Sequence, residues 1–411
     1  MRIALFHNLP SGGAKRSMYE ATRRLAACHT IDAYSLSSAN HEFADLRPYV
    51  ARHHVFSFRP WPLFGSPFGR LNQVVRLADL WRLRRLARRM AAAIPWAAYD
   101  VLLAHPCQFE GSPSLLRWAQ DTPTVYYCHE PVRLLYEPMP PRPYAPTASR
   151  RQRLLDRFDP LPGLYRRTLR RIDRANLHSA NAVLVNSQFI RESVRRIYQA
   201  SAIVSYHGVD VDCFRPLSLP RQRFVLSVGS LTPLKGFDWL IRAIARIPLA
   251  RRPPLVIVSN FQNPPERAYL EQLAQTSGVD LRLLANISDE RLVELYNQAS
   301  LTAYAPHAEP FGLVPLESMA CATPIVAVRE GGIAESVIHE ETGLLTERDP
   351  QQIAAAIERI LDDASLAETY GRNGRAHVLQ RWTWEQAAAT LEQHLISVSS
   401  RQPSGSRKDR R

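Results

Sequence analysis

Residues 301–317 read LTAYAPHAEPFGLVPLE. The first residues have the apolar, β-rich character of a buried strand ending near Ala305, and a helical segment begins near Leu313 after a short loop. Short apolar runs of this kind alternate with longer segments of helical periodicity along most of the chain. This alternation is typical of an α/β protein with parallel sheets.

The strand candidates form two consecutive series, which predict two doubly wound, Rossmann-like domains facing each other across a cleft. The first series is expected at residues 3–7, 31–36, 101–104, 124–128, 182–185 and 202–206, and the second at 224–228, 255–259, 281–284, 301–305 and 324–328. Periodicity is lost between Gly208 and Pro220. We therefore expect an N-terminal domain over 1–207 and a C-terminal domain over 208–379.

Three further segments have a distinctive composition. Residues 138–162 are rich in Pro and Arg and predict a long exposed loop, and residues 401–411 predict a disordered basic tail. Residues 69–94 predict a long helix carrying Trp81 and seven arginines. That helix is either solvated or in contact with an anionic membrane surface.

Composition and cysteine usage argue against a disordered or fibrous protein, a disulfide framework and a zinc site. Of the 411 residues, 45% are hydrophobic and 22% charged, as in ordinary globular proteins. The five cysteines lie far apart without metal-site spacing, so we expect reduced thiols. The apolar run Ile3–Phe6 is too short for a signal peptide, and no apolar stretch approaches the roughly 20 residues that span a bilayer. We therefore expect a cytoplasmic protein, with peripheral membrane contact left open.

The net charge of +14 lies in the first half of the chain. Residues 1–215 contain 31 Lys and Arg against 16 Asp and Glu, whereas residues 216–400 contain 16 against 21. This asymmetry indicates an anionic partner for the first domain, which is a phosphate-bearing substrate, an acidic membrane or nucleic acid. Nucleic acid is disfavoured because aromatic residues are not interleaved with the basic runs.

Two glycine-containing turns follow predicted strands and precede predicted helices. In residues 11–15, SGGAK, the backbone at Gly13 suits a phosphate or sugar oxygen at a helix N-terminus, although a tight turn alone also requires glycine. In residues 227–236, SVGSLTPLKG, Lys235 faces the crevice where α/β sheets bind nucleotides. A lysine there is suited to a diphosphate, with a plain surface lysine as the alternative.

Two carboxylates in the opening stretch are candidates for sugar binding. Glu309 lies in the loop and Glu317 about one turn into the helix, so both can point into the same crevice. A loop carboxylate can accept hydrogen bonds from sugar hydroxyls, and a helical one can bind both hydroxyls of a ribose. The alternative for Glu317 is a first-turn carboxylate stabilised by the helix dipole.

The spacing of Glu309 and Glu317 around Pro-Phe-Gly resembles the E-x7-E signature of retaining glycosyltransferase family 4, the glycosyl transferases group 1. The resemblance covers roughly residues 1 to 390. Other segments resembling family elements in order are YYCHEP at 126–131, VNS at 185–187, HGVD at 207–210, the 228–236 turn, and residues 287–296.

The resemblance implies a GT-B fold, with the acceptor on the N-terminal domain, the nucleotide-sugar on the C-terminal domain, and a return helix at about 380–396. It further implies that Lys235 neutralises the diphosphate, Glu317 binds the ribose, His129 approaches the donor sugar and Glu309 lies where the new bond forms. The other donor-binding positions it implies are Gly13, Gly229, Ser230, Asn286, Ile287, Phe311, Gly312 and Leu313. Ser230 replaces an arginine common in the family, and Asn286 replaces a common glycine.

The expected reaction moves a hexose-type sugar from a UDP- or GDP-sugar to a hydroxyl of a glycan or lipid-linked saccharide, in cell-surface polysaccharide assembly. We expect retention by same-face attack, with a covalent intermediate on Glu309 as the alternative. No cofactor is expected, and no metal, since the single Asp-x-Asp pair, Asp210 and Asp212, lies in the linker. Rival interpretations are a sugar phosphorylase, a UDP-sugar epimerase and an NAD-dependent oxidoreductase. The last is disfavoured because the Gly12-Gly13 turn does not have the G-x-G-x-x-G pattern of dinucleotide-binding proteins.

Overall fold

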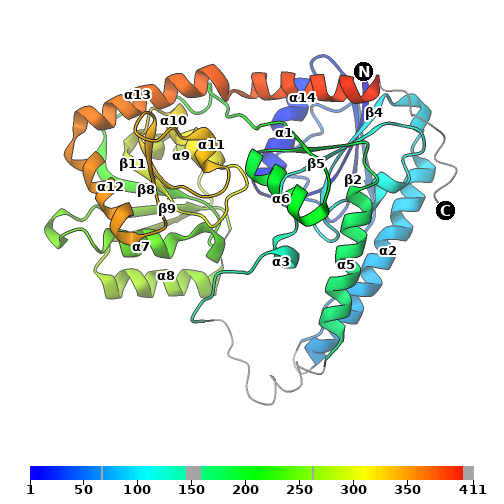
Figure 1. The fold of residues 1–411 in the computed structure, drawn as a ribbon, viewed down its shortest axis with the longest axis horizontal. Helices are drawn as coiled ribbons and strands as arrows, with labels where there is room; N and C mark the ends of the chain where they lie inside the picture. Colours follow the sequence, from blue (N-terminus) through cyan, green and yellow to red (C-terminus); the bar gives the residue numbers. More distant parts are fainter. Residues whose placement is uncertain (66–67, 145–158, 262, 401–411) are drawn as a thin grey trace.

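The computed structural model describes residues 1–65, 68–144, 159–261 and 263–400. Its strands form two separate parallel sheets that lie side by side (Figure 1). The predicted α/β class and the two doubly wound sheets are therefore confirmed.

The first sheet has the strand order β3-β2-β1-β4-β5-β6-β7. Its strands are β1 Arg2–Asn8, β2 Thr30–Leu36, β3 Arg52–Phe56, β4 Val101–Cys107, β5 Thr124–Cys128, β6 Ala182–Val185 and β7 Ile203–Val204. Six of them match predicted strands, whereas β3 was not predicted. It is an edge strand of sequence RHHVF, which lacks a continuous apolar run.

The second sheet has the order β10-β9-β8-β11-β12-β13. Its strands are β8 Gln222–Val228, β9 Leu255–Ser259, β10 Leu281–Ala285, β11 Ala299–Tyr304, β12 Ile325–Val328 and β13 Gly343–Thr346. The edge strand β13 was also missed, because its glycine suggests a turn. A Cβ at Gly343 would lie 2.5 Å from the carbonyl oxygen of Ile325, so glycine allows β13 to approach β12 closely.

Helices connect the strands and cover both faces of each sheet. In the first domain they are α1 Gly13–Leu25, α2 Asn72–Ala93, α3 Arg133–Tyr136, α5 Leu161–Leu177 and α6 Gln188–Tyr198. In the second they are α7 Phe237–Ile244, α8 Pro264–Ser277, α9 Asp289–Gln298, α10 Leu313–Ala320, α11 Ile333–Ser336, α12 Pro350–Asp362 and α13 Ala364–Arg381. The last helix is α14 Trp384–Ser399.

Alternate residues of β1 show how the first sheet is packed. Ile3 and Leu5 face one apolar core, shared with α1 and α14, whereas Ala4 and Phe6 face a second core on the other side of the sheet. A sheet buried on both faces explains why its central strands read as continuous apolar runs. The second domain has a single large core around β8, β9 and β11.

Helix α14 returns to the first domain after α13 has covered the second (Figure 1). Its side chains Leu391 and Leu395 are buried with α1 and β4 in the first core. Thr383 begins the helix with a reciprocal capping box. The outgoing linker passes directly beside this point, where Val209 forms a bridge to Thr383.

Other expectations have mixed outcomes. The helix predicted at 69–94 is present as α2, and all five cysteines are free. In the predicted loop, α5 already begins at Leu161, and residues 145–158 lie outside the described residues, as does the predicted tail 401–411. Among the described helices, none combines the length and apolar character needed to cross a membrane.

Candidate active site

The site is positioned by the point at which the strand order of the second sheet reverses, between β8 and β11. In open α/β sheets, ligands bind outside the carboxyl ends of the strands at such a switch point. The loop after β8 carries Lys235, and the loop after β11 carries Glu309. The two loops singled out by their sequence are therefore the two that flank the switch point.

Lys235 and Glu309 form an ion pair. The distance from Lys235 Nζ to Glu309 Oε2 is 2.8 Å, and both side chains are mostly buried. Gly229 lies against the lysine stem, so that a Cβ there would come within 3.2 Å of Lys235 Cγ. Gly236 has a φ of 64°, and a Cβ would lie 2.0 Å from the carbonyl oxygen of Ala305. Glycine at 236 is thus needed to bring the two loops together.

Helix α10 presents the second carboxylate. Gly312 precedes the helix in a left-handed conformation with a φ of 97°, and Phe311 before it is buried. Glu317 is buried, and its Oε2 accepts a hydrogen bond of 2.8 Å from the hydroxyl of Tyr296. Burial raises the pKa of Glu317, while the charge of Arg16 and the bond from Tyr296 oppose that rise. One oxygen of Glu317 is therefore fixed, and the other faces Arg16 at 3.9 Å.

Tyr304 is a buried tyrosine next to the ion pair. Burial raises the pKa of its phenol well above the usual value, and the charges of Glu309 and Glu317 add to this rise. Lys235 Nζ lies 5.9 Å from the centre of the same ring. The structure therefore places Tyr304 beside the Lys235–Glu309 ion pair, and the charge of Glu317 also acts on its phenol.

A cavity of about 600 Å³ opens between the domains next to Glu317. The first domain contributes α1 and residues 42–49, the linker contributes residues 208–214, and the second domain contributes Asp289, Leu313 and Glu317. Arg16 crosses it by donating to both oxygens of Asp289, at 2.8 and 2.9 Å. The cavity is thus lined by charged groups of both signs.

The remaining predicted donor positions lie at the start of α1 and in the loops after β8 and β10. Gly13 lies against Leu313, which a Cβ would meet at 3.8 Å. Ser230 follows Gly229 in the switch-point loop, and Ile287 lies in the loop before α9. Asn286 in the same loop has a φ of 51°, a conformation that glycine and asparagine adopt most readily. Of the predicted set, Leu313 and Glu317 line the cavity directly.

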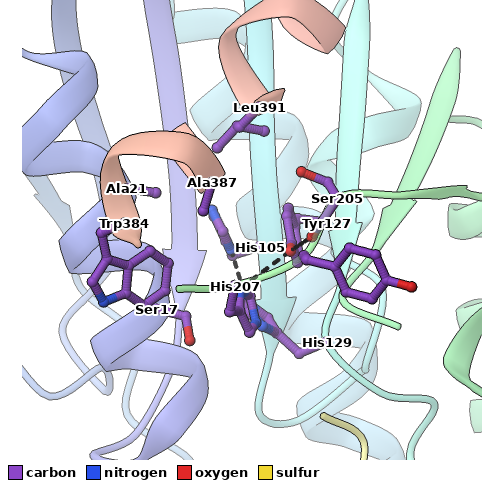
Figure 2. Close-up of a pocket in the computed structure, with 11 residues that line it drawn as sticks. Ser17, Ala21, His105, Tyr127, His129, Ser205, His207, Trp384, Ala387 and Leu391 are labelled. Carbon is purple, nitrogen blue, oxygen red and sulfur yellow. Dashed lines mark hydrogen bonds between the residues drawn. The ribbon is translucent and has the colours of Figure 1, made fainter. Parts of the chain in front are cut away.

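His129 lies at the end of β5 in a group of buried rings (Figure 2). Its Nε2 is 3.0 Å from Nδ1 of His105, and its ring lies 5.4 Å from that of His207. His207 in turn packs edge-on against Phe311 of the second domain at 5.4 Å. His129 is therefore connected to Phe311 of the second domain through the ring of His207, and it is not among the residues lining the large cavity.

The burial of His129 determines its charge. Burial lowers the pKa of His129 to about 3, and His105 and His207 are shifted in the same direction by burial. The Nδ1 atom of His129 is buried and has no partner among the described residues. A neutral imidazole with a free ring nitrogen can exchange a hydrogen bond with a hydroxyl but does not act as a cation near neutral pH.

Arginines of the first domain that the sequence interpretation missed also reach the site. Arg133 on α3 donates to the backbone oxygens of His307 and Ala308, directly before Glu309, at 2.8 and 2.6 Å. Arg142 pairs with Asp238 and Glu266 and donates to the oxygen of Pro233, two residues before Lys235. Neither arginine could be assigned from local sequence, because each contact crosses between domains.

Two further contacts join the domains beside the Glu309 loop. The hydroxyl of Ser187 donates to the backbone oxygen of Pro310. Glu335 on α11 accepts from the backbone N–H groups of Gln188 and Phe189 at 2.8 and 2.9 Å, so a carboxylate of the second domain caps α6 of the first. Among the described residues, no group of three or more His, Cys, Asp or Glu is arranged to hold a metal ion.

Two parallel-sheet domains with charged groups converging between them define a class of proteins that bind nucleotides and their derivatives. The model of Glycosyltransferase Family 4 matches residues 11–213, and that of Glycosyl transferases group 1 matches residues 214–377. The chain belongs to this family of glycosyltransferases, with the GT-B fold.

Two relatives and two solved structures illustrate the similarity. The alpha-1,3/1,6-mannosyltransferase ALG2 of Rhizomucor pusillus is 24% identical over 98% of this chain and 93% of that protein. The D-inositol 3-phosphate glycosyltransferase of Acidothermus cellulolyticus is 40% identical, over 43% of this chain and 44% of its own length. Among solved structures, sucrose-phosphate synthase from Thermosynechococcus elongatus has a TM-score of 0.71 at 24% identity, over 96% of this chain and 98% of that one. Anabaena HepE in complex with UDP and glucose has a TM-score of 0.69 at 20% identity, over 96% and 99%.

Proposed function

We propose that this glycosyltransferase moves a hexose-type sugar from a nucleoside-diphosphate sugar to a hydroxyl of a glycan or lipid-linked saccharide, in cell-surface polysaccharide assembly. The observation that carries the proposal is the Lys235–Glu309 ion pair in the two loops that flank the switch point, together with Glu317 on the wall of the interdomain cavity. A cation, carboxylates and a helix N-terminus are groups that can bind a diphosphate, a ribose and a sugar.

Lys235 has the central electrostatic role in this proposal. Cleavage of a nucleotide-sugar develops charge on the leaving diphosphate, and a fixed cation stabilises that charge in the transition state. Arg16 is already paired with Asp289, and Arg133 with Glu130. With serine at position 230, Lys235 is the cation assigned to the diphosphate, and donor binding exchanges its partner Glu309 for phosphate oxygens.

We assign Glu317 to the ribose, the backbone at Phe311 to Leu313 to donor oxygens, Glu309 to the reacting face of the sugar, and His129 to a sugar hydroxyl. His129 has a buried ring nitrogen without a partner among the described residues, which fits hydrogen bonding better than proton transfer. We further propose same-face attack with retention, in which the leaving phosphate accepts the acceptor's proton, and we assign no metal ion or cofactor to this step.

Donor binding is tested by thermal unfolding in the presence of UDP, GDP, ADP and their sugars. One nucleotide series is expected to raise the midpoint by several degrees, because a ligand at about 100 times its Kd stabilises the fold by roughly 2.7 kcal/mol. Absence of any shift for every nucleotide and nucleotide-sugar would contradict the proposal.

Retention and metal independence are tested on the product. Proton NMR of the purified product is expected to show the same anomeric configuration as the donor, and turnover is expected to be unchanged in EDTA. An inverted product would contradict the same-face mechanism, and loss of turnover that added Mg²⁺ or Mn²⁺ restores would contradict metal independence.

A further inference from the structure

Helices α2 and α5 lie alongside each other and form an arm that projects from the first domain, on the side that carries α3 (Figure 1). The chain entering α2 runs alongside this helix, and large apolar side chains are exposed from the middle of α2 to its first turn. They are between 46% and 61% exposed and comprise Trp61, Leu63, Phe64, Phe68, Leu71, Val74 and Trp81, here called the apolar tip. The surface of a soluble protein rarely exposes so many large apolar residues in one short segment.

The arm is strongly basic. Helices α2 and α5 contain eleven arginines, and their only acidic residues are Asp79 and Asp173, both of which are buried. Asp79 is paired with Arg82. The exposed surface of the two helices therefore carries positive charge without acidic residues to balance it, which is unusual for a merely solvated helical pair.

Aromatic and cationic groups are combined at the tip. The guanidinium carbon of Arg85 lies 3.5 Å from the centre of the Trp81 ring, and that of Arg82 lies 5.0 Å from the centre of the Trp61 ring. The chain at Phe64 is held by two hydrogen bonds with the side chain of Asn72, so the apolar segment is fixed on α2. Tryptophan and arginine together are suited to the headgroup region of a bilayer.

The arm is physically connected to the reaction site. Leu135 of α3 is buried in a small core with Leu80 of α2 and Leu169 of α5. Two residues earlier, Arg133 holds the backbone of His307 and Ala308 next to Glu309. An arm seated on a membrane would thus present the first domain and its acceptor side to lipid-borne substrates through one short series of packed groups.

We propose that the apolar tip and the arginines of α2 and α5 form a docking surface for a bilayer containing anionic phospholipids. The arginines bind lipid phosphates, and the exposed tryptophan and phenylalanine side chains enter the acyl boundary. The inference deepens the proposed function, since its use in presenting a lipid-linked acceptor rests on that proposal. Charge favours this occupant over a second copy of the chain, whose own arm would bring like charges together.

Co-sedimentation with vesicles tests the docking surface without donor or acceptor. The protein is expected to bind vesicles of phosphatidylcholine mixed with phosphatidylglycerol, and to bind vesicles of phosphatidylcholine alone about tenfold or more weakly. The double variants F64S/F68S and R166E/R167E are each expected to weaken binding to the mixed vesicles by about tenfold or more. All four residues are exposed, so both variants are expected to keep the melting temperature of the parent.

Matched variants on the second domain serve as controls. L249S/F261S removes two apolar residues that are 74% and 54% exposed, and R242E/R246E reverses two exposed arginines. Both are expected to bind vesicles like the parent protein. Failure of the parent to bind mixed vesicles, arm variants that bind normally, or arm variants that instead convert a self-associated parent to monomer in sedimentation velocity would each overturn the proposal.

These outcomes are separable from a failure of the proposed function. Nucleotide-dependent thermal shifts and turnover on a water-soluble acceptor measure the donor site, which the arm variants do not touch. Vesicle binding without any nucleotide shift would leave the docking surface standing and reject the proposed donor. A nucleotide shift without vesicle binding would do the reverse.

Discussion

At the scale of single residues, the position of Lys235 and Glu309 followed from their place after two strands, because the carboxyl ends of parallel strands meet at one edge of a sheet. Their mutual ion pair did not follow, since both side chains had been assigned to binding the substrate. The roles of Arg16 and Arg133 were out of reach for a different reason. Each arginine donates to groups of the other domain, which are far away in the sequence.

Replacing Lys235 with alanine is expected to lower kcat by roughly 100-fold or more, because removing one preorganised electrostatic group typically costs 10² to 10³ in rate. Initial rates at saturating donor measure this. Lys235→Arg, which keeps the charge, serves as the matched control and should retain more activity than the alanine variant. Full turnover in Lys235→Ala would remove the assigned role.

Lys15 provides a pH-dependent prediction. Burial lowers the pKa of Lys15 from 10.5 to about 8 in the folded protein. Between these values the unfolded chain binds the proton that the folded chain has lost, so this group makes the fold more stable as pH rises. Relative to Lys15→Met, the parent is expected to gain roughly 1 to 3 kcal/mol between pH 7 and pH 10.5.

Urea unfolding of parent and variant at matched pH values isolates this effect, because the other titrating groups are common to both proteins. A stability difference that stays constant across the range would show that Lys15 keeps its ordinary pKa.

At the scale of elements, the sequence predicted eleven strands in the correct places and missed two at sheet edges. The partly buried β3 has two histidines where a central strand has apolar residues. The buried β13 is only four residues long and begins with a glycine that its close approach to β12 requires. Central strands are recognisable because both faces are buried. The cap on α6 was unpredictable, since its carboxylate belongs to another domain.

That cap leads to a prediction about α6. Glu335→Ala leaves the N–H groups of Gln188 and Phe189 without their carboxylate, which is expected to cost roughly 0.5 to 2 kcal/mol and to speed hydrogen exchange in the first turn of α6. Asp363→Ala removes a comparable cap from α13, far from the domain interface. It should lower stability similarly without changing exchange in α6, and equal protection of α6 in both variants would refute the interdomain cap.

At the scale of the whole molecule, the linker that leaves the first domain lies in contact with the start of α14, the helix that returns to it. Gly208 is required there, because a Cβ would lie 2.4 Å from the carbonyl carbon of Thr383. The return helix was predicted from the family resemblance. Its packing on α1 through Leu391 and Leu395 was not predicted and is seen in the structure. Helix α14 is thus continuous in sequence with the second domain and part of the core of the first.

Leu395→Ala is therefore expected to weaken the first domain selectively. The side chain is fully buried, and its truncation should cost about 2 to 5 kcal/mol. Hydrogen exchange should rise in β1, β4 and β5 and stay unchanged in β8 and β9. Leu270→Ala, a fully buried leucine of α8, is the matched control with the opposite pattern. Loosening of the second sheet by Leu395→Ala would contradict this division.

The return of α14 has a consequence for biosynthesis. On the ribosome the first sheet emerges early, yet one layer of its core is encoded some two hundred residues later, after the whole second domain has been made. The second domain, continuous in sequence, can complete its core while the first is still missing Leu391 and Leu395. Nascent chains should therefore show a finished C-terminal sheet before the N-terminal one, reversing the usual vectorial order.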